Sequence, residues 1–130
     1  MKPDILPAAL RASAAGLIAR EAAVNLLIGH RYWLTRPDFL TEFVDTFDSL
    51  TDGTPMAAIC WPRSVAALDR GQLAGSGSEN RILRLAASLA DGIPADLQTV
   101  LSSLDDGNLQ HVITAIRHAA GRRPGQASPL

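Results

Sequence analysis

The sequence predicts an all-α protein, a compact bundle of five to six helices joined by short loops. Three observations predict this fold class. Apolar residues recur three and four positions apart, helix caps and glycine stops separate the apolar segments, and no segment alternates as a β-strand does. The chain has 130 residues, of which 47% are apolar and 19% charged. Because this composition is typical of one globular domain, we expect a single helical domain over residues 1–121.

The first predicted helix covers residues 7–29 and has Pro7 in its first turn, where a missing N–H costs little. One face of this helix carries Leu10, Leu17, Val24 and Ile28. The second face is also apolar, and it holds Ala12, Ala15, Ala19, Ala23 and Leu26. A helix that is apolar on two sides belongs at the centre of a bundle or at a dimer contact.

The second predicted helix begins after Thr35, which suits an N-cap, and Leu34 and Phe39 have the spacing of a hydrophobic staple. Its apolar stripe is formed by Phe39, Phe43, Phe47 and Leu50. The acidic residues Asp38, Glu42 and Asp45 share another face. Such a row can hold a hard cation, but a solvated acidic face is the interpretation we favour, and we expect no metal site.

In the middle of the chain, the residue types predict a turn over residues 51–55 and a short helix over residues 62–70 that ends at Gly71. Residues 54–61 fit either a short helix or an extended connector, and the sequence leaves both open. Ser76 and Glu79 have the spacing of a capping box, which starts a fourth helix. The Ser76-Gly77-Ser78 segment also resembles a phosphate cradle, but it lacks a lysine and a preceding strand.

The fourth predicted helix runs to about Asp91, and Gly92 ends it. A fifth helix is expected over residues 94–103. The sixth begins at the N-cap Asp105, and Gly121 ends it. Its predicted buried stripe consists of Val112, Ile113, Ile116 and Ala120. Residues 122–130 are expected to form a disordered tail.

Charge and cysteine content limit the classes of function. The formal net charge is −1, which gives no overall attraction to nucleic acid or anionic lipid. The single cysteine, Cys60, excludes an intramolecular disulfide and favours a reducing compartment, so we expect a cytoplasmic protein with a structural thiol. The prolines and the acid near the start do not suit a signal peptide, and no apolar run is long enough to span a membrane.

Glu21 is the candidate ligand-binding residue with the clearest physical argument. It falls among the apolar positions of the first predicted helix, and a buried carboxylate is costly unless a cation stabilises it. Asn25 follows one turn later. One hypothesis is a polar pocket at these two residues, with Trp33 and Trp61 lining it. The alternative is a structural ion pair between Glu21 and an arginine such as Arg31, Arg81 or Arg84, with both tryptophans packed in the core.

A second hypothesis is DNA binding by the last two predicted helices, which have the order of a helix-turn-helix. The residues that would contact phosphates or bases are His111, Arg117, His118, Arg122 and Arg123. Asp105 and Asp106 oppose this hypothesis because they would repel phosphate groups at the start of the last helix.

Residues 67–73, 81–90 and 108–121 resemble a group of small actinomycete proteins. The resemblance covers the C-terminal half of the chain and implies a bacterial, cytoplasmic setting. Because that group has no assigned activity, no functional residue is carried over from it.

The leading functional hypothesis is a helical module that acts through protein contacts as a homodimer. The sequence contains no catalytic constellation, so we expect neither an enzyme nor a cofactor. The second, alanine-rich face of the first predicted helix is the surface that suggests self-association. DNA binding and a small-molecule pocket near Glu21 and Asn25 remain the alternatives.

Overall fold

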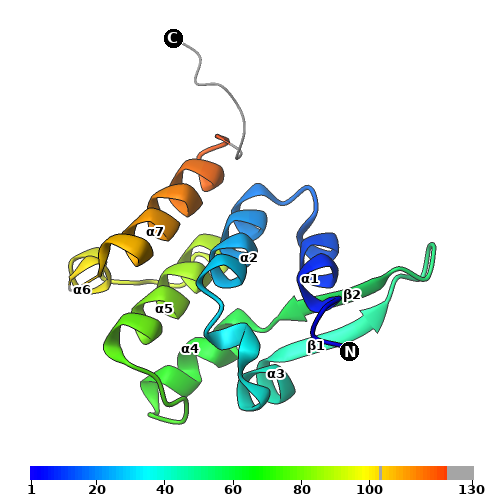
Figure 1. Ribbon diagram of the computed structural model, residues 1–130, viewed down its shortest axis with the longest axis horizontal. Helices are drawn as coiled ribbons and strands as arrows, with labels where there is room; N and C mark the ends of the chain where they lie inside the picture. The colour runs from blue at the N-terminus through cyan, green and yellow to red at the C-terminus, as the bar shows by residue number, and fades with distance from the viewer. Residues whose placement is uncertain (103, 123–130) are drawn as a thin grey trace.

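The computed structural model describes residues 1–102 and 104–122 and combines helices with one two-stranded antiparallel sheet (Figure 1). The elements in chain order are α1 (Leu6–Ala14), α2 (Ile18–His30), the 3-10 helix η1 (Trp33–Thr35), α3 (Pro37–Phe43), β1 (Val44–Asp48), β2 (Pro55–Ile59), α4 (Trp61–Asp69), α5 (Gly77–Asp91), α6 (Leu97–Leu101) and α7 (Asp106–Ala119). Helices dominate, but the sheet makes the all-α prediction wrong. Residues 123–130, most of the predicted tail, lie outside the described residues.

The predicted first helix is two helices, because the chain breaks at Gly16. This glycine has a φ of +84°, a left-handed conformation that a residue with a side chain adopts only at a cost. The break lets α1 turn back, so that α1 packs against both α2 and β2 (Figure 1). The prediction of one continuous helix over residues 7–29 was therefore wrong at its middle.

Helix α2 is the central element of the fold. It packs against α5 and α7 and also contacts α1 and η1. Ala22 and Ala23 are completely buried, and these small side chains allow neighbouring helices to approach closely. Of the two places expected for a helix with two apolar faces, α2 occupies the centre of the bundle.

The hairpin β1–β2 replaces the second half of the predicted second helix. Residue Val44 pairs with Ile59 and Asp48 pairs with Pro55, so residues 54–61 are largely extended. Valine, threonine and phenylalanine in β1 favour extended backbone, and the partner strand supplies the hydrogen bonds. Phe47 consequently lies on an exposed strand and not on a helical stripe.

Three predicted helix ends are confirmed. Ser76 and Glu79 form both hydrogen bonds of a capping box, and Gly92 ends α5 in a left-handed conformation. The Asp105 carboxylate accepts a hydrogen bond of 2.7 Å from the backbone N–H of Asn108 at the start of α7. The predicted fifth helix is shorter than expected, because only Leu97–Leu101 is helical.

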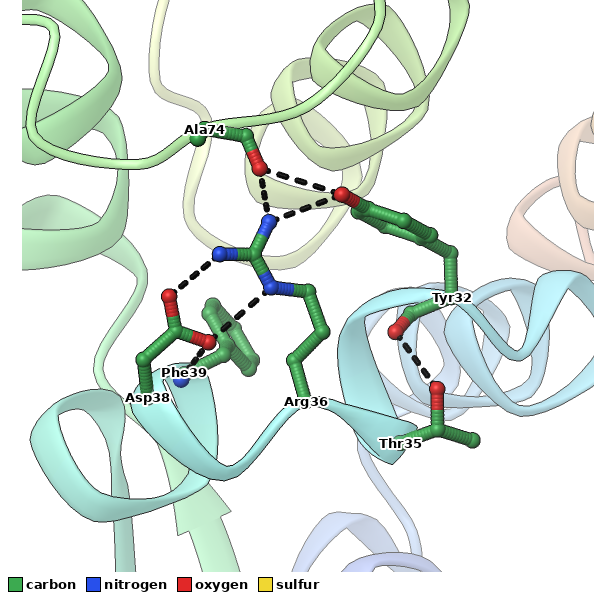
Figure 2. Close-up of polar contacts among 6 residues, drawn as sticks. All are labelled: Tyr32, Thr35, Arg36, Asp38, Phe39 and Ala74. Carbon is green, nitrogen blue, oxygen red and sulfur yellow. Dashed lines mark hydrogen bonds and ion pairs between the residues drawn. The ribbon is translucent and has the colours of Figure 1, made fainter.

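The predicted N-cap Thr35 was wrong, because Arg36 holds that position. The Thr35 hydroxyl instead donates a hydrogen bond of 2.9 Å to the carbonyl of Tyr32. Figure 2 shows that Arg36 joins the start of α3 to the loop before α5: its guanidinium contacts the Asp38 carboxylate, the Tyr32 hydroxyl and the Ala74 carbonyl. The hydrogen bond from Arg36 lowers the pKa of Asp38 from its usual 3.8.

Close packing around α2 gives the first testable prediction. Ala23→Leu adds a branched side chain where no space is left, and overpacking of this kind costs about 1–3 kcal/mol of unfolding free energy. Urea unfolding at neutral pH measures the change. Ala8→Leu, on the exposed side of α1, is the matched control and should change stability by less than about 0.5 kcal/mol. Equal effects of the two substitutions would contradict the central place of α2.

Candidate functional site

Glu21 lies in a nearly buried polar contact between α2 and α7. Its Oε1 atom is 3.2 Å from His118 Nε2, and its Oε2 atom accepts a hydrogen bond of 3.0 Å from the backbone N–H of Gly16. The exposed side-chain fractions are 18% for Glu21 and 5% for His118. The side-chain partner of this carboxylate on α7 is therefore a histidine 97 residues away in sequence, whereas the sequence suggested an arginine.

Asn25 faces a different neighbour. Its Oδ1 atom accepts a hydrogen bond of 2.9 Å from Arg11 Nε, which ties α2 to α1. Neither Glu21 nor Asn25 lines the two clefts described below. Through these contacts, Asn25 joins α2 to α1 and Glu21 joins α2 to α7.

The two tryptophans belong to the core. Trp33 is fully buried, donates a hydrogen bond of 2.9 Å to the carbonyl of Glu79, and stacks at an angle on Phe39 with ring centroids 5.5 Å apart. Trp61 is nearly buried at the start of α4. Trp33 and Trp61 are thus both part of the hydrophobic core, as the alternative interpretation expected.

The basic residues proposed to contact DNA are separated by the fold. Arg117 and Arg122 are exposed, but His118 points inward to Glu21. His111 is half-buried against Gly29 of α2. Arg123 lies outside the described residues. Only the two described arginines of this set are therefore available to a phosphate backbone, and Asp106 lies on the same helix.

The outer face of α7 is the feature that sequence analysis placed wrongly. Val112, Ala115 and His118 face inward, whereas the predicted core residues Ile113 and Ile116 are exposed. Together with Leu109 they form what we call the outer stripe, whose exposed fractions are 38% for Leu109, 40% for Ile113 and 45% for Ile116. Ala120, the last predicted core residue of this helix, is exposed as well.

The spacing of the outer stripe explains both its shape and the error. Positions 109, 113 and 116 lie within about 60° of one another on a helix with about 100° per residue. In a sequence this spacing is the usual sign of a core face. Here the small residue Ala115 lets α7 lie close to α2 on its other side, so the branched side chains point to solvent.

A polar junction lies where the end of α2 meets the starts of α5 and α7. His30 is half-buried there, and its Nδ1 atom has no hydrogen-bond partner among the described residues. Burial lowers the pKa of His30 from its usual 6.5, and the nearby His111 acts in the same direction. The carboxylates of Glu79 and Asp105 oppose this shift.

Two clefts accompany these features. The cleft between α1 and β2 has a volume of about 280 Å³ and is lined by Cys60, Trp61 and the Arg20–Asp91 ion pair. Cys60 is only partly buried there. A larger groove of about 680 Å³ lies between α1, the end of α2 and α3. Sequence analysis missed this groove because three separate segments form it.

Comparisons with known proteins give no relative. No family model, no curated protein and no solved structure matches the chain. Among residues 1–102 and 104–122, no group of three or more potential ligands is placed to hold a metal ion. No helix in that part of the chain is long and apolar enough to cross a membrane.

Acid should destabilise the protein through His30. Because burial favours the neutral ring in the folded state, the unfolded chain takes up a proton first as the pH falls. The contribution of His30 to stability is therefore present above the usual pKa of 6.5 and is lost as the pH falls through the lower folded value. Urea midpoints measured from about pH 7.5 to about pH 5 should fall more steeply for the wild type than for His30→Gln. Parallel pH profiles of the two proteins would refute this assignment.

Proposed function

We propose that this protein is a self-associating helical module, and that two copies bind each other through the outer faces of their α7 helices. One observation carries the proposal: Leu109, Ile113 and Ile116 form an exposed aliphatic stripe on a helix whose other side is held in the core. Solvent-exposed aliphatic residues that form a continuous stripe mark contact surfaces more often than isolated ones do.

The stripe has the spacing of a helix-pairing seam. Its residues are four and then three positions apart, and Ala120 follows four positions later. This is the spacing of core positions in paired helices, where side chains of one helix fit between those of the other. Contacts with α2 already hold α7 in place, so pairing requires little additional ordering of its backbone.

Charges next to the stripe favour a second copy in the antiparallel orientation. Asp106 and Arg117 lie on the same flank of the stripe, about 60° and about 80° around the helix from Leu109. Neither side chain forms an ion pair within the described part of the chain. In an antiparallel pair, Asp106 of each copy lies beside Arg117 of the other, whereas a parallel two-fold pair places the charged flanks of the two helices on opposite sides of the seam.

The same geometry satisfies the symmetry of a homodimer. A two-fold axis near Ile113 places Leu109 of one copy against Ile116 of the other, and both contacts occur twice. Two further exposed leucines, Leu97 and Leu101, lie on α6, which precedes α7 in the chain. The stripe alone is smaller than the roughly 800 Å² per partner of a standard interface, so we expect a dissociation constant in the micromolar range.

Ile113→Lys tests the stripe. A lysine at the centre of the seam must lose water or be left unpaired on association, so sedimentation velocity should show a monomer where the wild type is dimeric. Thr114→Lys is the matched control, because it adds the same charge at the next residue, which is exposed on the polar side of α7. Both variants should melt within a few degrees of the wild type. A wild type that stays monomeric throughout the micromolar range would refute the proposal.

A charge exchange tests the orientation. Asp106→Arg alone and Arg117→Asp alone each place like charges together and should weaken the dimer by about threefold to tenfold. The double variant restores opposite charges, so its dissociation constant should return close to that of the wild type. A double variant weaker than both single variants would show that the two residues do not meet across the dimer.

A further inference from the structure

The groove between α1, the end of α2 and α3 has the properties of a small-molecule site. Its volume of about 680 Å³ lies within the range of ligand pockets in proteins. Four aliphatic side chains line it, Leu6, Ile28, Leu34 and Leu40, together with three prolines, two threonines and Arg31. Such a surface excludes strongly polar ligands and favours one with a hydrocarbon part.

Arg31 is the one charged residue among those that line this groove. Within the described residues its guanidinium has no hydrogen-bond acceptor and no ion-pair partner, while Arg11 and Arg36 nearby in the fold are both paired. An arginine presents a planar pair of donors that matches the two oxygens of a carboxylate. The groove therefore combines an aliphatic surface with a single free cation.

The backbone at Arg31, the C-cap residue of α2, has a positive φ. Its φ is +75° and its ψ is −38°, and the N–H of Tyr32 donates a hydrogen bond of 3.0 Å to the carbonyl of His30. This is a γ-turn with positive φ, a rare and costly conformation for a residue with a side chain. A glycine would adopt it more easily, but a glycine would place no cation at the groove.

The groove also continues beyond its main volume. An adjoining hollow of about 340 Å³ shares Leu6, Leu40 and Thr41 with it and extends to Val44 and Thr46. Because the two hollows share three lining residues, they adjoin each other; the second is more polar than the first, and Arg31 lines only the first. An elongated ligand with one anionic end fits this arrangement better than a compact one.

We propose that this groove binds an aliphatic monocarboxylate, with the carboxylate on Arg31 and the hydrocarbon chain along Leu34 and Leu40 toward Val44. This inference goes beyond self-association, because none of these residues belongs to α7. The site binds and orients the molecule and carries out no covalent step.

Straight-chain alkanoates of roughly six to roughly twelve carbons, kept below micelle-forming concentrations, are the probe. Affinity measured by calorimetry at neutral pH should rise by about twofold to fourfold per added methylene until the groove is filled. The alcohol of the same length lacks the carboxylate and should bind about tenfold more weakly. Backbone NMR shifts should locate the bound chain at Ile28, Leu34 and Leu40.

Two substitutions of Arg31 separate binding from folding. Arg31→Gln should weaken alkanoate binding about tenfold and leave alcohol binding unchanged. Arg31→Gly should weaken binding as much while its melting temperature stays equal or rises, because glycine relieves the positive φ. Arg70→Gln removes an exposed arginine outside the groove and is the matched control with wild-type affinity.

The proposal is overturned if alkanoate and alcohol bind equally, or if affinity does not depend on chain length. It is also overturned if Arg31→Gln binds as the wild type does, or if NMR shifts place the ligand outside the groove. Binding that survives in the monomeric Ile113→Lys variant supports the groove independently of the proposed dimer.

Discussion

The need to cover α2 on nearly every side governs the rest of this structure. Ala22 and Ala23 have no exposed surface, so α5 and α7 must approach closely and present small or flat side chains. Helix α7 meets this requirement with Val112 and Ala115 at the contact. Helix α7 packs mainly against α2, so the branched residues on its opposite side remain in solvent. The exposed outer stripe is thus a consequence of how α2 is buried, and it leaves an apolar surface that a monomer does not cover.

Local signals in the sequence predicted the helix ends well. The wrong predictions concern features that depend on contacts between distant segments of the chain. The caps at Ser76 and Asp105 are hydrogen bonds across three residues, so their residue types suffice to identify them. The helical spacing that continues from Phe43 to Phe47 gave no sign of a strand, because β1 depends on hydrogen bonds to β2. The inward face of α7 is decided in the same way by the shape of α2, since the spacing of Ile113 and Ile116 fits a core or an interface equally well.

The candidate sites could likewise be predicted only where the signal is local in the sequence. The burial of Glu21 was predictable from its position among apolar residues, but its partner His118 comes from the far end of the chain. No sequence pattern marks the groove at Arg31, because its lining comes from the start of α1, the end of α2 and α3. One local signal was available: an arginine directly after the end of α2, where a glycine is the usual residue. An arginine in a costly backbone conformation is therefore a stronger indication of a functional role than an arginine on an ordinary helix surface.

The two proposed surfaces lie on either side of α2, with the outer stripe on α7 and the groove beside α1 and α3 (Figure 1). Because the proposed groove and the outer stripe are formed by different elements, pairing of two α7 helices would leave both grooves open. Coupling between the two proposed sites would require a ligand to change the position of α2, because α2 packs against α7 and contributes Ile28 to the groove, with Arg31 directly after it. Ala22 and Ala23 are completely buried between these neighbours, so a shift of α2 would disturb close packing on several sides. Since a ligand can couple two sites only through a difference between two states, we expect the proposed dimer and the proposed ligand site to act independently of each other.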